Sequence, residues 1–159
     1  MNNANLIFTR AGLNDIAELV RMRIYYIVQD YGHLAETDRA KMEKSLPEYF
    51  ARNLEKNIFA FVAKDGGKIV ATAFLLVVEK PASPAFINGK TGIVLNVCTM
   101  EEYRAKGIAT RLMQMLVDFA RQNELNRIDL SATKMGYSVY KKLGFEDLQS
   151  EYQEMRLKL

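Results

Sequence analysis

Apolar residues recur at two spacings along the chain, and the spacing separates expected strands from expected helices. Runs rich in β-branched and aromatic residues predict strands, whereas apolar residues three to four positions apart predict helices facing a core. Strands are expected at residues 6–10, 58–63, 69–78, 92–99, 127–132 and about 152–157. Helices are expected at residues 16–23, about 37–56, 110–120 and 138–143. Helices that interrupt a sheet in this order indicate an α/β or α+β fold.

Turn-forming residues mark several element ends. Gly66 and Gly67 separate two strand-like runs and readily adopt positive φ, which predicts a β-hairpin. Asn14 is the expected N-cap of the first helix. Pro47 lacks an N–H group, so we expect it to bend or restart the second helix. Gly144 is expected to end the last helix.

Size and charge narrow the class of protein. A chain of 159 residues with 49% hydrophobic residues predicts a single domain spanning residues 1–159. The net charge is only +3, and no Lys/Arg run is present, so neither nucleic acid nor another polyanion is an expected partner.

The apolar segments and the single cysteine indicate the cellular compartment of the protein. The longest apolar run, residues 69–78, is too short to span a bilayer, and residues 1–5 lack the features of a signal peptide. We therefore expect a soluble, unexported protein without membrane contact. The single cysteine, Cys98, cannot form an internal disulfide, which fits a reducing cytoplasm.

A glycine-containing turn between a strand and a long helix is the main candidate for chemistry. Residues 103–110 follow the apolar run 92–99 and open the amphipathic helix, and Gly107 and Ala109 keep the turn free of bulky side chains. The first N–H groups of a helix lack intrahelical partners, and the helix dipole adds positive potential there. The turn therefore predicts a phosphate-binding site, to which Arg104 and Lys106 would add charge.

Two motifs together resemble the GNAT superfamily of acyl-CoA-dependent N-acetyltransferases. The first motif is Arg104-Ala105-Lys106-Gly107-Ile108-Ala109, and the second is Tyr140-Lys141-Lys142-Leu143-Gly144-Phe145, beginning 36 residues later. The resemblance covers nearly the whole chain and includes the order of its elements. It implies a mixed central sheet of six to seven strands, flanked by about four helices and splayed between the fourth and fifth strands.

The resemblance also implies acetyl-CoA as the acyl donor and no metal. The cofactor pyrophosphate would bind backbone N–H groups of Arg104, Ala105, Lys106, Gly107, Ile108, Ala109 and Thr110. The preceding strand would carry a bulge, and Val97, Cys98 and Thr99 would hold the pantetheine arm, one N–H facing the thioester oxygen. Many relatives place an Asn against pantetheine where this chain has Thr133, so Thr133 is a further cofactor-binding candidate.

Tyr140 falls on the tyrosine that, in the family, protonates the departing thiolate of CoA. A phenol suits this role because its pKa of about 10 lies close to that of a thiol, about 8.5. Packing of an aromatic ring in the core is the alternative interpretation of Tyr140.

The group that deprotonates the acceptor amine is left open by the sequence. The candidates are Asp30, His33, Glu36, Glu79, or water alone. Cys98 lies in an apolar strand and is expected to be a buried small residue rather than a nucleophile. Tyr25, Tyr26 and Tyr31 are candidates for lining an acceptor pocket, with packing as the alternative.

These features favour an enzyme that transfers an acetyl group to a primary amine of a small molecule by direct attack in a ternary complex. The alternatives are acetylation of a protein N-terminus or lysine, and a non-catalytic acyl-CoA-binding module. A homodimer formed through residues 149–159 is possible by analogy with relatives that pair through edge strands or C-terminal hairpins.

Overall fold

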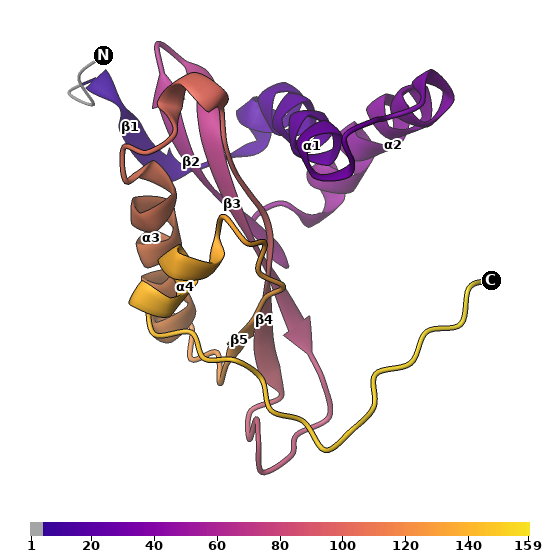
Figure 1. Ribbon diagram of the computed structural model, residues 1–159, viewed down its shortest axis with the longest axis vertical. Coiled ribbons are helices and arrows are strands. Elements are labelled where there is room, and N and C mark those ends of the chain that lie inside the picture. The colour runs from indigo at the N-terminus through magenta and orange to yellow at the C-terminus, as the bar shows by residue number, and fades with distance from the viewer. Residues whose placement is uncertain (1–4) are drawn as a thin grey trace.

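A five-stranded mixed sheet forms the centre of the molecule (Figure 1). The computed structural model describes residues 5–159; residues 1–4, on which part of the unexported expectation rests, lie outside the described residues. The strands are β1 (Ile7–Arg10), β2 (Ile58–Asp65), β3 (Lys68–Glu79), β4 (Lys90–Thr99) and β5 (Ile128–Asp129). They follow one another in sequence order; the first four are antiparallel neighbours, and β5 runs parallel to β4.

Four α-helices cover the two faces of this sheet, as the resemblance implied. They are α1 (Ile16–Tyr31), α2 (Glu36–Asn53), α3 (Ile108–Gln122) and α4 (Tyr137–Lys142), with short 3-10 turns η2 (Leu13–Asp15) and η3 (Glu101–Tyr103). Helices α1 and α2 lie on one face, and α3 and α4 on the other (Figure 1). Each face has its own buried apolar cluster, centred on Phe50 and Phe74 beneath α1 and α2 and on Leu75 and Leu116 beneath α3. Within residues 5–159, no helix is both long and apolar enough to cross a membrane.

The predicted hairpin between β2 and β3 is confirmed. Its two-residue turn places Gly66 at φ +54° and Gly67 at φ +88°, and the strands pair from Asp65↔Lys68 outward. Both φ values lie in the left-handed region that residues with a Cβ rarely enter, so this turn requires its two glycines.

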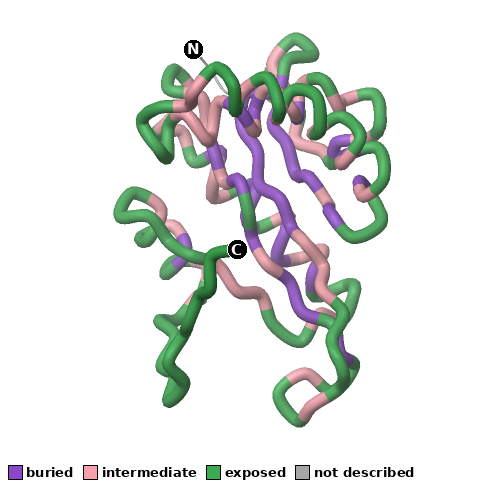
Figure 2. The backbone as a smooth tube through the Cα atoms, turned by 90° about the vertical axis from the view of Figure 1, so that its right-hand side faces the viewer, coloured by how far each residue is buried: buried purple, intermediate pink, exposed green. Residues whose placement is uncertain are grey.

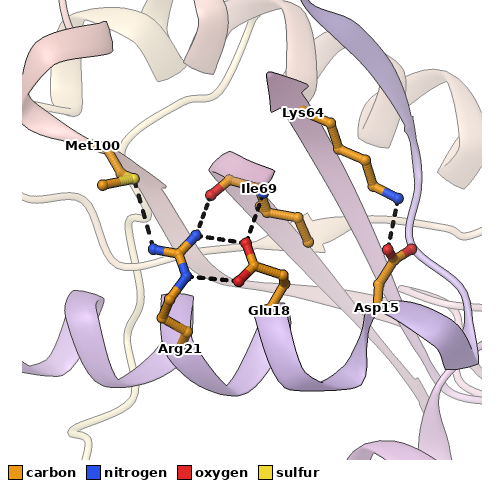
Figure 3. A network of polar contacts seen from close by, with 6 residues as sticks. All are labelled: Asp15, Glu18, Arg21, Lys64, Ile69 and Met100. Atoms are coloured by element: carbon orange, nitrogen blue, oxygen red, sulfur yellow. Dashed lines mark hydrogen bonds and ion pairs between the residues drawn. The ribbon is translucent and has the colours of Figure 1, made fainter. Parts of the chain in front are cut away.

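A polar network joins α1 to the start of β3 (Figure 3). The Arg21 guanidinium donates to both carboxylate oxygens of Glu18, at 2.9 and 2.7 Å, and to the carbonyl oxygen of Ile69 at 2.6 Å. The Ile69 N–H in turn donates to Glu18 Oε2 at 2.9 Å. Arg21 also holds the pKa of the Glu18 carboxyl below its ordinary value. The network fixes α1 against the start of β3.

The number of strands differs from the expected six to seven. No strand forms at residues 152–157, and β5 is shorter than the expected 127–132. The segment after α4 instead runs away from the body of the molecule and is exposed (Figures 1 and 2). A strand is stable only when its backbone pairs with a neighbouring edge, and the described part of this chain gives this segment no such partner.

The expected N-cap of the first helix is wrong, and one of the two outcomes expected of Pro47 is excluded. Asn14 does not cap α1; instead Asp15 Oδ2 accepts a hydrogen bond from the Gly12 N–H at 3.0 Å and closes the turn. Pro47 does not restart the second helix, because α2 continues through it from Glu36 to Asn53. Leu46 and Phe50 pack against the sheet on either side of the proline, and this packing keeps the helix in one piece.

Candidate active site

A bulge interrupts β4 where the resemblance placed the cofactor-binding part of the strand. Thr72 pairs with Cys98 and Phe74 pairs with Leu95, so Ala73 lies opposite two residues of β4. One of them, Asn96, has φ +52° and is 3% exposed. A bulge of this kind bends the strand and redirects its backbone groups.

Beyond the bulge, β4 separates from β5. The two strands pair only at Gly92↔Ile128 and Ile93↔Asp129, so the rest of this β4 edge has no neighbouring strand among residues 5–159. The splay between the fourth and fifth strands therefore exists as expected. The separated edge belongs to one continuous strand, Lys90–Thr99, which is paired with β3 on its other side.

The direction of the backbone groups on this edge follows from strand alternation. The Met100 N–H donates to the Val70 carbonyl oxygen, so the N–H of Cys98 also faces β3, whereas those of Val97 and Thr99 point to the open edge. The buried Thr99 hydroxyl has no hydrogen-bond partner in the described structure. Two of the three predicted residues thus present N–H groups to the opening, and an unpartnered hydroxyl lies beside them.

The loop before α3 has the backbone shape of an anion site. Ala105 has φ +59° and Gly107 has φ +74°, and Gly107 is the N-cap of α3. The first bond of the helix runs from the Arg111 N–H to the Gly107 carbonyl oxygen, so the N–H groups of Ile108, Ala109 and Thr110 precede the helical ladder. A Cβ built on Gly107 would meet no atom within 4 Å. The loop therefore offers backbone donors and open space, which fit a pyrophosphate.

The two basic side chains of the loop fold back onto the protein. Arg104 Nε donates to the Thr99 carbonyl oxygen at 3.1 Å, and Arg104 Nη2 donates to Gln29 Oε1 at 3.1 Å. Lys106 Nζ donates to the Glu102 carbonyl oxygen at 2.8 Å and lies 5.3 Å from the ring centroid of Tyr103. The backbone, rather than these side chains, would make the principal contacts with an anion.

Tyr140 is a buried residue of α4, 8% exposed. A Cβ on Gly136 would lie 2.8 Å from the Tyr140 ring and 3.2 Å from its hydroxyl oxygen, so the ring packs directly on the glycine backbone. Phe145 packs edge-on against the same ring at 5.9 Å. Burial raises the pKa of the Tyr140 phenol, and the nearby phenol of Tyr26 raises it further. Tyr140 is therefore protonated at neutral pH and able to donate.

The phenol of Tyr26, on α1, lies near enough to Tyr140 to raise the pKa of that residue. Burial raises the pKa of the Tyr26 phenol itself, and the charge of Asp30 raises it further, whereas the charge of Arg23 lowers it. Burial also raises the pKa of the Cys98 thiol to about 11, so this group is a neutral thiol at neutral pH. Cys98 therefore has the character of a buried small residue rather than a nucleophile.

The remaining candidates lie at the periphery. Asp30, His33 and Glu36 are exposed around the end of α1 and the start of α2. Glu79 lies opposite Lys90, beyond the point where β4 and β5 pair, so the structure separates it from the bulge. Thr133 is exposed, and its hydroxyl accepts a hydrogen bond from the Gly136 N–H at 3.2 Å. Thr133 therefore shapes the turn that presents Tyr140.

Sequence reasoning missed several residues that build this site. Asn96 locks the bulge through Thr72, whose hydroxyl donates to the Asn96 carbonyl oxygen at 2.8 Å. Gly136 makes room for Tyr140. Both carried a signal: an Asn within an apolar strand is unusual and tolerates positive φ, and a Gly one helical turn before a key aromatic indicates close approach.

Taken together, the bulged strand, the splayed edge and the glycine loop form the arrangement that the resemblance to acyl-CoA-dependent acetyltransferases implied. The chain matches the family model described as Acetyltransferase (GNAT) family over residues 22–145, and it belongs to that family of acetyltransferases. Membership of this family makes the protein an acyltransferase. Among curated proteins, no sequence match was found.

Solved structures show the same fold. A predicted acetyltransferase from Clostridium acetobutylicum, solved with acetyl-CoA, is 30% identical, with a TM-score of 0.82 over 95% of this chain and 96% of that chain. A GCN5-related N-acetyltransferase from Ralstonia eutropha is 22% identical, with a TM-score of 0.77 over 94% and 98% of the two chains. An aminoglycoside acetyltransferase from an uncultured soil sample, in complex with trehalose, is 18% identical, with a TM-score of 0.72 over 99% and 100%.

Proposed function

We propose that the protein transfers an acetyl group from acetyl-CoA to a primary amine of a small molecule by direct attack in a ternary complex. The observation that carries the proposal is the open edge of β4, bounded by the bulge at one end and the glycine loop at the other. The 30% identical relative solved with acetyl-CoA supports the choice of acyl donor.

The described residues fit the two ends of this donor. The N–H groups around Gly107 and at the start of α3 would hold the pyrophosphate, and the exposed N–H groups of Val97 and Thr99 would hold the pantetheine arm. When bound, acetyl-CoA supplies the acetyl group as a thioester.

Two groups of the chain would act directly on the reaction. The Val97 N–H, fixed by the bulge, would donate to the thioester oxygen as negative charge develops there; loss of one such donor costs about 3 kcal/mol in other enzymes. As the amine nitrogen bonds to the acetyl carbon and the carbon–sulfur bond breaks, the Tyr140 hydroxyl would pass its proton to the sulfur. Burial keeps Tyr140 protonated until that step. The proton that the new amide nitrogen then loses would return through water to the Tyr140 phenolate.

The acceptor ammonium must first lose a proton. Of the four candidates, Asp30 is the one whose charge raises the pKa of Tyr26, so it is the carboxylate that we propose to receive this proton through water. The low net charge of +3 favours a small acceptor over an acidic or polyanionic surface. The single free cysteine fits the reducing cytoplasm that this proposal assumes.

Calorimetric titration with acetyl-CoA and with CoA tests the proposal first. We expect micromolar binding of both, followed by release of CoA when amines are added. No binding to a folded sample would overturn the proposal. Binding without CoA release from any amine would favour a non-catalytic acyl-CoA-binding module, and release only with peptides would favour a protein acetyltransferase.

A further inference from the structure

Arg23 of α1 is a half-buried cation without a carboxylate partner among residues 5–159. Its Nη1 donates a hydrogen bond to Asn96 Oδ1 at 3.1 Å, and its guanidinium lies over the Tyr26 ring, 5.5 Å from the centroid. These contacts fix the guanidinium in place and use only part of its donor capacity. Buried or half-buried charges are ordinarily paired, so an ordered guanidinium without an anion indicates a ligand.

Arg23 is also the one charged residue among the described residues that line a largely apolar cavity. This cavity has a volume of about 200 Å³ and lies between α1, α2 and the sheet; its walls include Tyr49, Phe50, Phe74 and Leu95. Such a volume accommodates one compact apolar side chain and no large ring system. The lining therefore combines one fixed positive charge with a small apolar space.

The position of the cavity relates it to acyl transfer. Leu95 lines the cavity next to the bulge, and Arg23, which also lines it, donates a hydrogen bond to the following residue, Asn96. Val97 comes next and presents its N–H to the open edge. Tyr26, on which Arg23 stacks, influences the pKa of Tyr140. A molecule held by Arg23 would thus lie beside the groups proposed to act on the thioester.

We propose that Arg23 and this cavity form the acceptor subsite, and that the acceptor is an amine that also carries a carboxylate and a compact apolar group, such as an apolar amino acid. The inference rests on the proposed function and names its substrate class. A guanidinium binds a carboxylate through two parallel hydrogen bonds, which position the ligand as well as hold it. The apolar group would fill the cavity and orient the amine towards the open edge of β4.

Matched acceptors test the carboxylate. Leucine and phenylalanine are compared with their amides and with 3-methylbutylamine and 2-phenylethylamine, which lack the carboxyl group. We expect kcat/KM for the acids to exceed that for the other compounds by about tenfold or more. Equal rates for acids and amides would overturn the proposal.

Variants test the role of Arg23. Arg23→Gln should lower kcat/KM for the acids by about tenfold or more, mainly through KM, and change the values for the carboxyl-free amines by less than about twofold. Arg23→Lys keeps the charge but lacks the planar guanidinium, so its kcat/KM for the acids should lie between those of wild type and Arg23→Gln. Arg39→Gln on the surface of α2 is the control for a lost charge. A uniform loss for all acceptors, together with weaker acetyl-CoA binding, would show a structural role and overturn the inference.

A binding measurement separates this inference from the proposed function. The acids are titrated into protein saturated with CoA, with wild type and Arg23→Gln in parallel. Binding that Arg23→Gln abolishes, without acetylation of any amine, would support the subsite and refute the proposed catalysis. Acetylation of amines with no measurable binding or preference for the acids would refute the subsite and leave the catalysis standing.

Discussion

Two hydrogen bonds join Thr72 of β3 to Asn96 of β4 at the bulge. Asn96 Nδ2 donates to Thr72 Oγ1 at 3.0 Å, and Thr72 Oγ1 donates to the Asn96 carbonyl oxygen at 2.8 Å. Both residues are buried, 1% and 3% exposed, and Asn96 has a positive φ. A non-glycine residue in that conformation costs about 1 kcal/mol or more, so the paired hydrogen bonds keep the bulge in place.

Replacing Thr72 by Val should therefore destabilise the bulge. The variant keeps the side-chain shape but leaves buried polar groups of Asn96 without their partner, and we expect the free energy of unfolding to fall by about 1–3 kcal/mol. Acetyl-CoA binding should weaken as well, since the bulge directs the Val97 N–H. Urea denaturation and calorimetry measure the two effects. Thr72→Ser retains the hydroxyl and is the control; wild-type stability in Thr72→Val would contradict this account.

Gly107→Glu should abolish acetyl-CoA binding. The space beside Gly107 is open, so the new side chain and its negative charge would occupy the position proposed for the pyrophosphate. Gly107→Ala shares the strain of φ +74° and adds only a methyl group, so its loss of affinity should be much smaller. Calorimetry on both folded variants decides the question, and undiminished affinity in Gly107→Glu would refute the pyrophosphate site.

Tyr140→Phe should lower kcat by about ten- to a thousandfold with little change in the Kd for acetyl-CoA. The change removes the hydroxyl but keeps the ring that packs on Gly136 and Phe145. The control is Tyr137→Phe, one turn earlier in α4, whose hydroxyl donates to Asp147 on the exposed side. If Tyr140→Phe turns over at the rate of the control, Tyr140 is not the acid.

Glu18→Gln should lower the free energy of unfolding by about 1–2 kcal/mol at neutral pH, because it weakens the charge-assisted hydrogen bonds to Arg21 and to the Ile69 N–H. The loss stays in this range because these bonds are partly accessible to solvent. The pKa of Glu18 is lowered in the folded protein, chiefly by Arg21. Its contribution is therefore complete above the ordinary pKa of 4.5 and is lost as the pH falls below that value. Denaturation of both proteins from pH 7 to pH 3 should show the difference shrinking.

The surface pair of Glu48 and Arg52, 3.7 Å apart and largely exposed, supplies the control for the Glu18 variant. Glu48→Gln should leave stability unchanged at every pH. A constant difference between wild type and Glu18→Gln down to pH 3 would show that the charge of Glu18 is not responsible.

The C-terminal segment predicts self-association. Met155, Leu157 and Leu159 are exposed and alternate with Arg156 and Lys158, the pattern of a strand with one apolar face. We expect this face to be buried against a second copy of the chain. Light scattering should report a dimer for the full chain and a monomer after removal of residues 149–159; identical masses for both would exclude this role.

Local features were the most predictable from the sequence. Gly66 and Gly67 specify their turn without help from the rest of the chain, and the apolar spacing of α3 locates that helix within two residues at each end. The C-terminal strand was wrong because its pattern is suitable for a strand, but pairing depends on an edge that the sequence does not reveal.

The candidate site could be predicted only where its residues lie close together in the sequence. The loop around Gly107 and the position of Tyr140 belong to short motifs, so they were found. The hydrogen bond between Arg23 and Asn96 joins residues 73 positions apart, and no periodicity encodes such a contact. Asp15 replaced Asn14 in closing the first turn for a similar reason: its other carboxylate oxygen accepts from Lys64 Nζ at 2.6 Å on β2.

The separation of β4 from β5 also affects the tendency of the protein to aggregate. A strand edge with free backbone groups is a template on which extended segments of other chains can pair, and proteins normally shield such edges. Here the shield would be the bound ligand itself, lying where a neighbouring strand is absent. Protein without a ligand on this edge would then aggregate sooner than protein with one.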